Sequence, residues 1–135
     1  MENKISSREY IRTEYGIIGK ILEDEDIAEN GVYIDTTFLD DYADETNFVK
    51  YEDIKKHSFN IINLIEEGDV IVLRDNKKYE VLKISWGKSK GNHIHIINAL
   101  RMQGGVDIFA DDIKSIVTKE QFKIIIYIIL YIILF

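Results

Sequence analysis

The pattern of apolar and polar positions along the chain predicts short β-strands separated by turns. In the stretch Asn60–Ile84 a glycine follows two glutamates, and the apolar, β-branched run Val70–Leu73 suits a buried strand. The polar turn Arg74–Lys78 separates this run from a second strand, Tyr79–Ile84. Because the turn lacks glycine, we expect a loop of four or five residues rather than a two-residue hairpin. The stretch therefore predicts a small, strongly curved antiparallel sheet.

The other predicted strands are equally short. Tyr10–Leu22 predicts two strands joined at Glu14–Gly16, or one strand bent at the glycines. His93–Ile97 alternates histidine with isoleucine, as a strand does. His57–Ile65 is interpreted as an extended segment or a single helical turn. We also expect strands at Gly31–Asp35, Val106–Ala110 and Lys114–Thr118, and a tight turn or 3₁₀ piece at Ala110–Ile113. Six or seven short strands without a long helix favour an all-β fold, a small antiparallel barrel of the SH3-like or a related kind.

Length and composition bound this fold. A chain of 135 residues is long enough for one domain with its own core, which we place at 1–122, with an acidic insertion at 35–60. Cysteine is absent, which excludes disulfides and thiolate metal sites and fits a reducing compartment. The polar start Met1–Arg12 does not resemble a signal peptide, so we expect a cytoplasmic location.

An apolar tail, 123–135, follows this domain. Its last twelve residues, Ile124–Phe135, carry no charge. As a helix they would span roughly 18 Å, short of the roughly 30 Å hydrocarbon core of a bilayer. Three interpretations stay open: the tail packs on the domain or forms an oligomer contact, it associates with a membrane, or it is a frameshifted end.

Charge is distributed unevenly. Residues 23–53 carry twelve acids and one base, whereas residues 74–101 carry seven bases and two acids. The acidic region is a candidate for binding a basic partner and the basic region for binding phosphates, although both also fit solvated loops. The candidate partner-binding residues are Glu23, Asp24, Asp26, Asp40, Asp41, Asp44 and Glu45. The alternative nucleic-acid-binding set is Arg74, Lys77, Lys78, Trp86, Lys88 and Lys90.

Signals for metal binding or catalysis are weak. His93 and His95 share one face of a predicted strand and His57 is a conceivable third ligand, but no further ligand has a diagnostic spacing. The acids at 40–45 lack the central glycine of a calcium loop. The chain has no cysteine nucleophile, no G-x-S-x-G and no H-E-x-x-H. We therefore expect no metal, no cofactor and no enzymatic activity.

Four pieces of the chain resemble a group of small proteins from phages and prophages of low-GC Gram-positive bacteria. They are YIRTEYGIIGKI at Tyr10–Ile21, HSFNIINLIEEGDVI at His57–Ile71, the hairpin Val70–Ile84, and FADDIKSIVTKEQF at Phe109–Phe122. Together they cover about two-thirds of the chain. The resemblance implies a compact β-barrel and a place among phage accessory genes, where anti-CRISPR and other anti-defence proteins occur. It carries no catalytic residues, and the chain departs from the group at 35–53 and in its tail.

These observations lead to one expected function and two alternatives. We expect a phage or prophage accessory protein that acts in the bacterial host cell. Its acidic surface would bind and inhibit a host defence complex, such as a Cas effector. The first alternative is a nucleic-acid-binding barrel that uses the basic 74–90 hairpin. The second is a structural phage component whose tail drives oligomerisation. A membrane partner is not expected.

Overall fold

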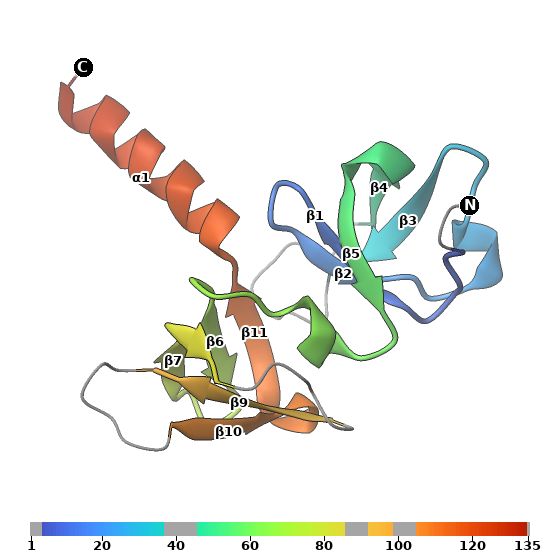
Figure 1. Ribbon diagram of the computed structural model, residues 1–135. Helices are drawn as coiled ribbons and strands as arrows, with labels where there is room; N and C mark the ends of the chain where they lie inside the picture. Colours follow the sequence, from blue (N-terminus) through green and yellow to red (C-terminus); the bar gives the residue numbers. More distant parts are fainter. Residues whose placement is uncertain (1–3, 37–45, 86–91, 99–104, 135) are drawn as a thin grey trace.

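Short antiparallel strands make up most of the protein. The computed structural model describes residues 4–36, 46–85, 92–98 and 105–134. The strands fall into two groups along the chain, and one helix extends away from them (Figure 1). The first group is β1 (Tyr10–Thr13), β2 (Ile18–Lys20), β3 (Gly31–Asp35), β4 (Thr46–Lys50) and β5 (Ile54–Ser58). The second is β6 (Val70–Leu73), β7 (Lys78–Glu80), β8 (Lys83–Ile84), β9 (His93–Ile97), β10 (Val106–Phe109) and β11 (Ile113–Val117).

The first unit, residues 4–58, is one five-stranded sheet in the order β4-β3-β2-β1-β5. Along β3, Val32 and Ile34 are fully buried while Tyr33 between them is exposed, as the two-residue period of a strand requires. Their partners in the core are Ile11, Ile21 and Val49. A 3₁₀ turn, η1 (Asp24–Asp26), lies between β2 and β3, and another, η3 (Tyr51–Asp53), leads into β5.

The second unit, residues 60–118, consists of two three-stranded sheets with the orders β10-β9-β8 and β11-β6-β7. Its larger core includes Ile71 from β6, Ile96 from β9 and Ile116 from β11. The 3₁₀ turn η4 (Ile61–Leu64) adds Ile62 and Leu64, both buried. A further 3₁₀ turn, η5 (Ala110–Asp112), leads into β11 as η3 leads into β5.

The two units repeat the same local structure about sixty positions apart. The amide of Ile21 donates to the carbonyl of Glu9 (2.9 Å), and the amide of Val81 donates to that of Asp69 (2.8 Å). After each first strand, the amide of Glu14 or Arg74 donates to the carbonyl of Asp53 or Asp112, at 2.9 Å in both units. The second pair of bonds joins the end of the first strand of each unit to its 3₁₀ turn, η3 or η5. We therefore treat the chain as two copies of one β-rich arrangement.

This arrangement differs from the single barrel with an insertion that we expected. The pairings among the described residues leave the sheets open. The segment 35–60 was expected to be an insertion, yet it supplies β4, η3 and β5 to the first sheet. Without β5, the first strand would lack one of its two neighbours. The residues 37–45 within this segment lie outside the described residues.

Most of the individual strand predictions are confirmed. The strands on either side of Glu14–Gly16 pair as an antiparallel hairpin, and His93–Ile97 is β9 with Ile94 and Ile96 buried. Ala110–Asp112 is a 3₁₀ turn, as predicted. The segment His57–Ile65, which we interpreted as extended or as a single helical turn, contains the end of β5 followed by the 3₁₀ turn η4. The antiparallel β character of the chain is therefore correct.

The tail is helical. Helix α1 (Lys119–Leu134) starts four residues before the predicted boundary and is roughly 24 Å long. It projects away from both units (Figure 1), and none of its residues is buried. In the part of the chain that the structure describes, no helix is both long and apolar enough to cross a membrane.

Candidate functional site

The first unit presents exposed acids on η1 and exposed aromatic rings on the neighbouring β3–β4 hairpin. Asp24 and Glu25 on η1 are exposed, and neither forms an ion pair with a cation among the described residues. The next carboxylate, Asp26, accepts a hydrogen bond from the amide of Glu23 (3.1 Å), which closes the turn. Glu23 and Asp26 thus have a local role in closing the turn, whereas Asp24 and Glu25 have no cation partner in the part of the chain that the structure describes.

An aromatic pair lies on the neighbouring hairpin. Tyr33 of β3 and Phe48 of β4 face each other across the strands, with ring centroids 4.9 Å apart. Both are exposed, at 43% and 41%. Strand β3 contacts η1, and a bridge between Ile27 and Val32 fixes the two elements together. We call Asp24, Glu25, Tyr33 and Phe48 the acidic–aromatic face.

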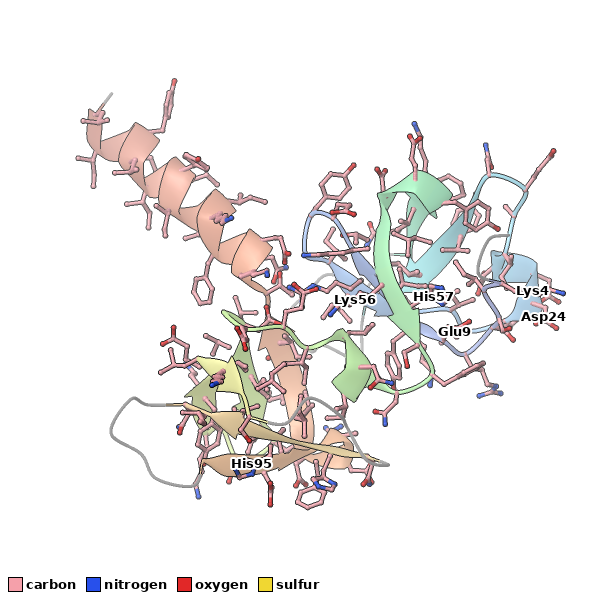
Figure 2. The ribbon with its side chains drawn as sticks, in the orientation of Figure 1. Lys4, Glu9, Asp24, Lys56, His57 and His95 are labelled. Carbon is pink, nitrogen blue, oxygen red and sulfur yellow. The ribbon has the colours of Figure 1, made fainter. Side chains whose placement is uncertain are left out.

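A hollow of about 640 Å³ opens on the same unit. Its apolar walls are Ile5, Ile27 and Ile54. The polar lining residues are Lys4, Glu29, Tyr51 and His57. Behind it the buried carboxylate of Glu9 contacts His57 Nδ1 (2.7 Å), so the carboxylate fixes the orientation of the ring. Figure 2 shows Lys4, Glu9 and His57 in this part of the first unit, with Asp24 nearby.

The predicted acidic residues divide into two sets. Glu23, Asp24 and Asp26 come together on η1. Asp40, Asp41, Asp44 and Glu45 lie outside the described residues. Within the described residues, the predicted acids of this set lie on or directly before η1, which contacts β3.

The predicted basic residues are also only partly placed. Arg74, Lys77 and Lys78 lie at the β6–β7 turn and are exposed. Arg74 Nε donates to the carbonyl of Asp111 (2.9 Å), and Lys77 is 3.9 Å from Asp75. Trp86, Lys88 and Lys90 lie outside the described residues. Arg74 is thus held by a backbone carbonyl, and Lys77 has the carboxylate of Asp75 nearby.

The three histidines do not converge on one metal site. His57 contacts Glu9, His95 contacts Asp107, and the ring of His93 lies 5.1 Å from that of Phe109. Among the described residues no group of three potential ligands is close enough to hold a metal ion.

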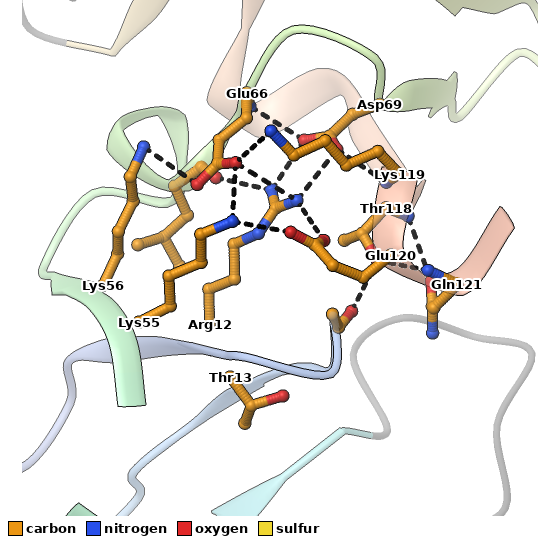
Figure 3. Close-up of polar contacts among 12 residues, drawn as sticks. Arg12, Thr13, Lys55, Lys56, Glu66, Asp69, Thr118, Lys119, Glu120 and Gln121 are labelled. Carbon is orange, nitrogen blue, oxygen red and sulfur yellow. Dashed lines mark hydrogen bonds and ion pairs between the residues drawn. The ribbon is translucent and has the colours of Figure 1, made fainter. Parts of the chain in front are cut away.

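The sequence analysis missed a buried ionic network between the two units. Arg12 on β1 is fully buried, and its guanidinium donates to both carboxylate oxygens of Asp69 (2.7 and 3.0 Å). It also donates to Glu120 Oε1 on α1 (2.6 Å) and to the carbonyl of Leu64 (2.8 Å). Figure 3 shows these contacts converging on one guanidinium. One arginine of the first unit thus holds the second unit and the base of the helix.

Lysines complete the network around a second carboxylate. Glu66 Oε1 lies 3.0 Å from Lys55 Nζ and 2.9 Å from Lys119 Nζ. Burial alone would raise the pKa of Glu66, but the hydrogen bonds from these lysines and the charge of Arg12 outweigh it and lower the pKa to about 2. The pKa of Glu120 is also lowered, because hydrogen bonds from Lys55 and Arg12 outweigh its desolvation. Glu66 and Glu120 are therefore both ionised near neutral pH.

The sequence did contain a signal for this network. That signal is Arg12, a charge among the strand residues of YIRT, whereas Asp69 lies in the turn EEGD and Glu120 in TKEQ at the start of α1. A charge enclosed by apolar strand residues needs a partner of opposite sign. The partners of Arg12 could not be predicted, because the sequence does not show that the two units face each other.

Comparisons with known proteins identify no relative: no family model, no curated protein and no solved structure matches this chain. The functional argument therefore rests on the chain's own residues.

Proposed function

We propose that this chain is a phage or prophage accessory protein that binds a host protein or ribonucleoprotein complex through its acidic–aromatic face. Binding inhibits a host defence complex, in the manner of an anti-CRISPR protein acting on a Cas effector in the bacterial cytoplasm. The protein is a binding module rather than an enzyme. In this proposal each of its two units is an SH3-like fold.

The observation that supports the proposal is an exposed aromatic pair together with exposed acids that form no ion pair among the described residues. Protein interfaces are enriched in aromatic residues, which supply most of the binding energy when a partner excludes water from them. Tyr33 and Phe48 provide such a patch, and Asp24 and Glu25 lie on the adjacent turn. Surfaces that hold guide RNA or target DNA are basic, so a negative face is complementary to them and speeds association.

The proposal is tested by partner capture. The tagged protein is expressed in an AT-rich Gram-positive host with active CRISPR systems, and co-purifying proteins are quantified. We expect a Cas effector to be enriched, and the enrichment to fall at least tenfold in the double variant Asp24→Asn, Glu25→Gln. The matched control is Asp75→Asn with Glu80→Gln, which removes two exposed acids from the second unit.

Each outcome has a defined meaning. If the variant Asp24→Asn, Glu25→Gln still captures the effector, the acidic–aromatic face is not the binding surface. If both variants lose capture equally, the loss reflects net charge rather than this face. Recovery of nucleic acid alone, with binding that weakens steeply with salt, would instead support the basic turn at Arg74–Lys78.

A further inference from the structure

Helix α1 exposes apolar side chains along most of its length. Every residue from Ile124 to Leu134 is isoleucine, leucine or tyrosine, and each is 46–72% exposed. Together they present on the order of 1,000 Å² of accessible surface, which is comparable with the roughly 800 Å² per partner of a standard stable interface. A helix with such a surface requires a cover in water.

The faces of this helix differ in chemistry. Tyr127 and Tyr131 are four residues apart and share one face, where their hydroxyl groups can stay in water. Another face carries Ile125, Ile128 and Ile132, whose three- and four-residue spacing is that of the seam between two packed helices. We call these three residues the isoleucine stripe. It is the face best suited to a neighbouring helix.

The isoleucine stripe starts in a hollow at the base of α1, with a volume of about 330 Å³. Its lining residues are Tyr15, Ile17, Gln121, Ile124 and Ile125. The first two belong to the connection between β1 and β2, and Tyr15 is 55% exposed. Thr118 Oγ1 donates to the carbonyl of Gly16 (2.8 Å), which fixes this connection against the start of the helix. The hollow is therefore a mostly apolar seat that continues the stripe.

The β1–β2 connection decides how a second helix can lie along the stripe. The axes of two packed helices are only about 8–10 Å apart. In a parallel pair the two β1–β2 connections would compete for the same gap, because each lies on the stripe side at the base of its helix. In an antiparallel pair each connection meets the distal part of the other helix, which projects away from both units (Figure 1). This alignment places Ile125 opposite Ile132 of the second copy, with Ile128 near the two-fold axis.

We propose that α1 pairs antiparallel with α1 of a second copy of this chain, and that the distal part of each helix lies in the hollow beside Tyr15 of the other. Both copies use the same stripe and the same hollow, so the contact is isologous and closes as a dimer. The proposal does not depend on the partner of the acidic–aromatic face.

Engineered cysteines test the orientation, because the chain has no cysteine of its own. A disulfide forms only where the two Cα atoms lie within about 7 Å. We expect Ile128→Cys to give an intermolecular disulfide under mild oxidation, as should Ile125→Cys combined with Ile132→Cys in one chain. Ile132→Cys alone should not, because a rise of about 1.5 Å per residue separates the two copies of this position by roughly 10 Å along the helix axis. Efficient cross-linking of Ile132→Cys would show a parallel pair and overturn the proposal.

The hollow is tested by sedimentation of the full chain. Tyr15→Ser removes the aromatic wall without changing α1, and we expect it to raise the dissociation constant of the dimer at least tenfold. The matched control is Tyr33→Ser, which changes another exposed tyrosine of the first unit and should leave the constant unchanged. Equal association of the Tyr15→Ser and Tyr33→Ser variants would exclude the hollow from the interface and overturn the proposal.

A lipid surface is the other cover that an apolar helix can take. Flotation with vesicles of phosphatidylcholine and phosphatidylglycerol distinguishes it from a second copy. We expect the chain to remain in the lipid-free fractions and the Ile128→Cys disulfide to form equally with and without vesicles. Flotation of the chain together with loss of that disulfide would overturn the proposal in favour of the membrane.

Discussion

Two equivalent residues adopt the left-handed backbone region, and only one of them is glycine. Arg8 has φ 75° and Gly68 has φ 99°, and each donates its amide across the matching turn, to Ile21 or Val81. A side chain in this region costs about 1–2 kcal/mol, while glycine loses about 0.5–1 kcal/mol through its greater freedom in the unfolded chain. Introducing glycine at position 8 should therefore stabilise the folded state, and replacing the glycine at position 68 should destabilise it.

We predict that Arg8→Gly raises the free energy of unfolding by about 0.5–1 kcal/mol and that Gly68→Ala lowers it by about 1 kcal/mol or more. In Gly68→Ala, the added Cβ would also lie 3.2 Å from Lys119 Cβ. Urea unfolding monitored by circular dichroism measures both. Destabilisation by Arg8→Gly would show that the Arg8 side chain makes contacts that outweigh its backbone cost.

The lowered pKa of Glu66 makes stability depend on pH in the acid range. A carboxyl whose pKa is lower in the folded state stabilises that state above its unfolded pKa, which is 4.5 for this group. That contribution is lost as pH falls from about 4.5 through about 2. We expect the urea midpoint to fall over this window, and Glu66→Gln to flatten the decline. The exposed control Glu80→Gln should keep the wild-type slope, and an equally steep decline in Glu66→Gln would refute the assignment.

Burial of Arg12 was not predictable from its own segment. In YIRT, strand alternation places Arg12 on the same face as Tyr10, and an arginine on such a strand usually faces solvent. In the structure the second unit covers that face, so Arg12 is enclosed by Asp69 and the start of α1. The strand was predictable because its pattern is local, whereas the charge pairing depends on contacts 57 and 108 residues away in sequence.

At the scale of elements, the strands with a strong local pattern and the hairpins between neighbours were predicted, whereas the partners distant in sequence were not. Val70–Leu73 and His93–Ile97 have unmistakable apolar spacing, and both appear with the predicted bounds. Thr46–Lys50 and Ile54–Ser58 carry several polar residues, so their sequences resembled an insertion. They are strands because β3 and β1 offer free edges to pair with.

Helix α1 makes a prediction of its own. Its side chains from Ile124 to Leu134 are 46–72% exposed and all are apolar or aromatic. Such a surface favours self-association in water. We expect the full chain to sediment as oligomers and a chain ending at Gln121 to sediment as a monomer. Because Lys119 and Glu120 are kept, the urea midpoint should change by less than the equivalent of about 0.5 kcal/mol.

The same experiment distinguishes a tail that drives self-association from a tail that stabilises the β units. An unchanged oligomer in the shortened chain would place the self-association surface on the β units. A large loss of stability would show that the helix packs against the body beyond its first turn. Lys77→Met, an exposed change on the second unit, serves as the control for both measurements.

At the scale of the whole molecule, the repeat has a short sequence trace. Glu52-Asp53-Ile54-Lys55 and Asp111-Asp112-Ile113-Lys114 each run from a 3₁₀ turn into the last strand of a unit. Four similar residues are a weak signal on their own, which is why the sequence was interpreted as one domain. The hydrogen bonds make the repeat clear, because backbone geometry is retained where side chains have diverged.

The two units are joined by the ion pairs of Arg12 and also by apolar contacts, since Ile18 of β2 belongs to the core of the second unit, and the charged part of this junction leads to the last prediction. Arg12 belongs to the first unit, while Asp69 and Glu120 belong to the second unit and the helix. Removing one partner of a buried ion pair leaves the other charge buried and costs about 3–5 kcal/mol. We predict that hydrogen exchange gives the same free energy of opening for the core amides of both units in the wild type. In Arg12→Met, the two units should give two different free energies of opening.

Ile11 and Ile34 report on the first unit, and Ile71 and Ile96 on the second, because all four are fully buried. Arg12→Met keeps most of the side-chain volume, so a change of free energy reflects the lost charge contacts rather than a cavity. The control Lys77→Met removes an ion pair whose side chains are 68% and 56% exposed and should change both values by less than about 0.5 kcal/mol. If the two sets of amides already differ in the wild type, the network does not couple the units; if they stay equal in Arg12→Met, contacts other than Arg12 couple them.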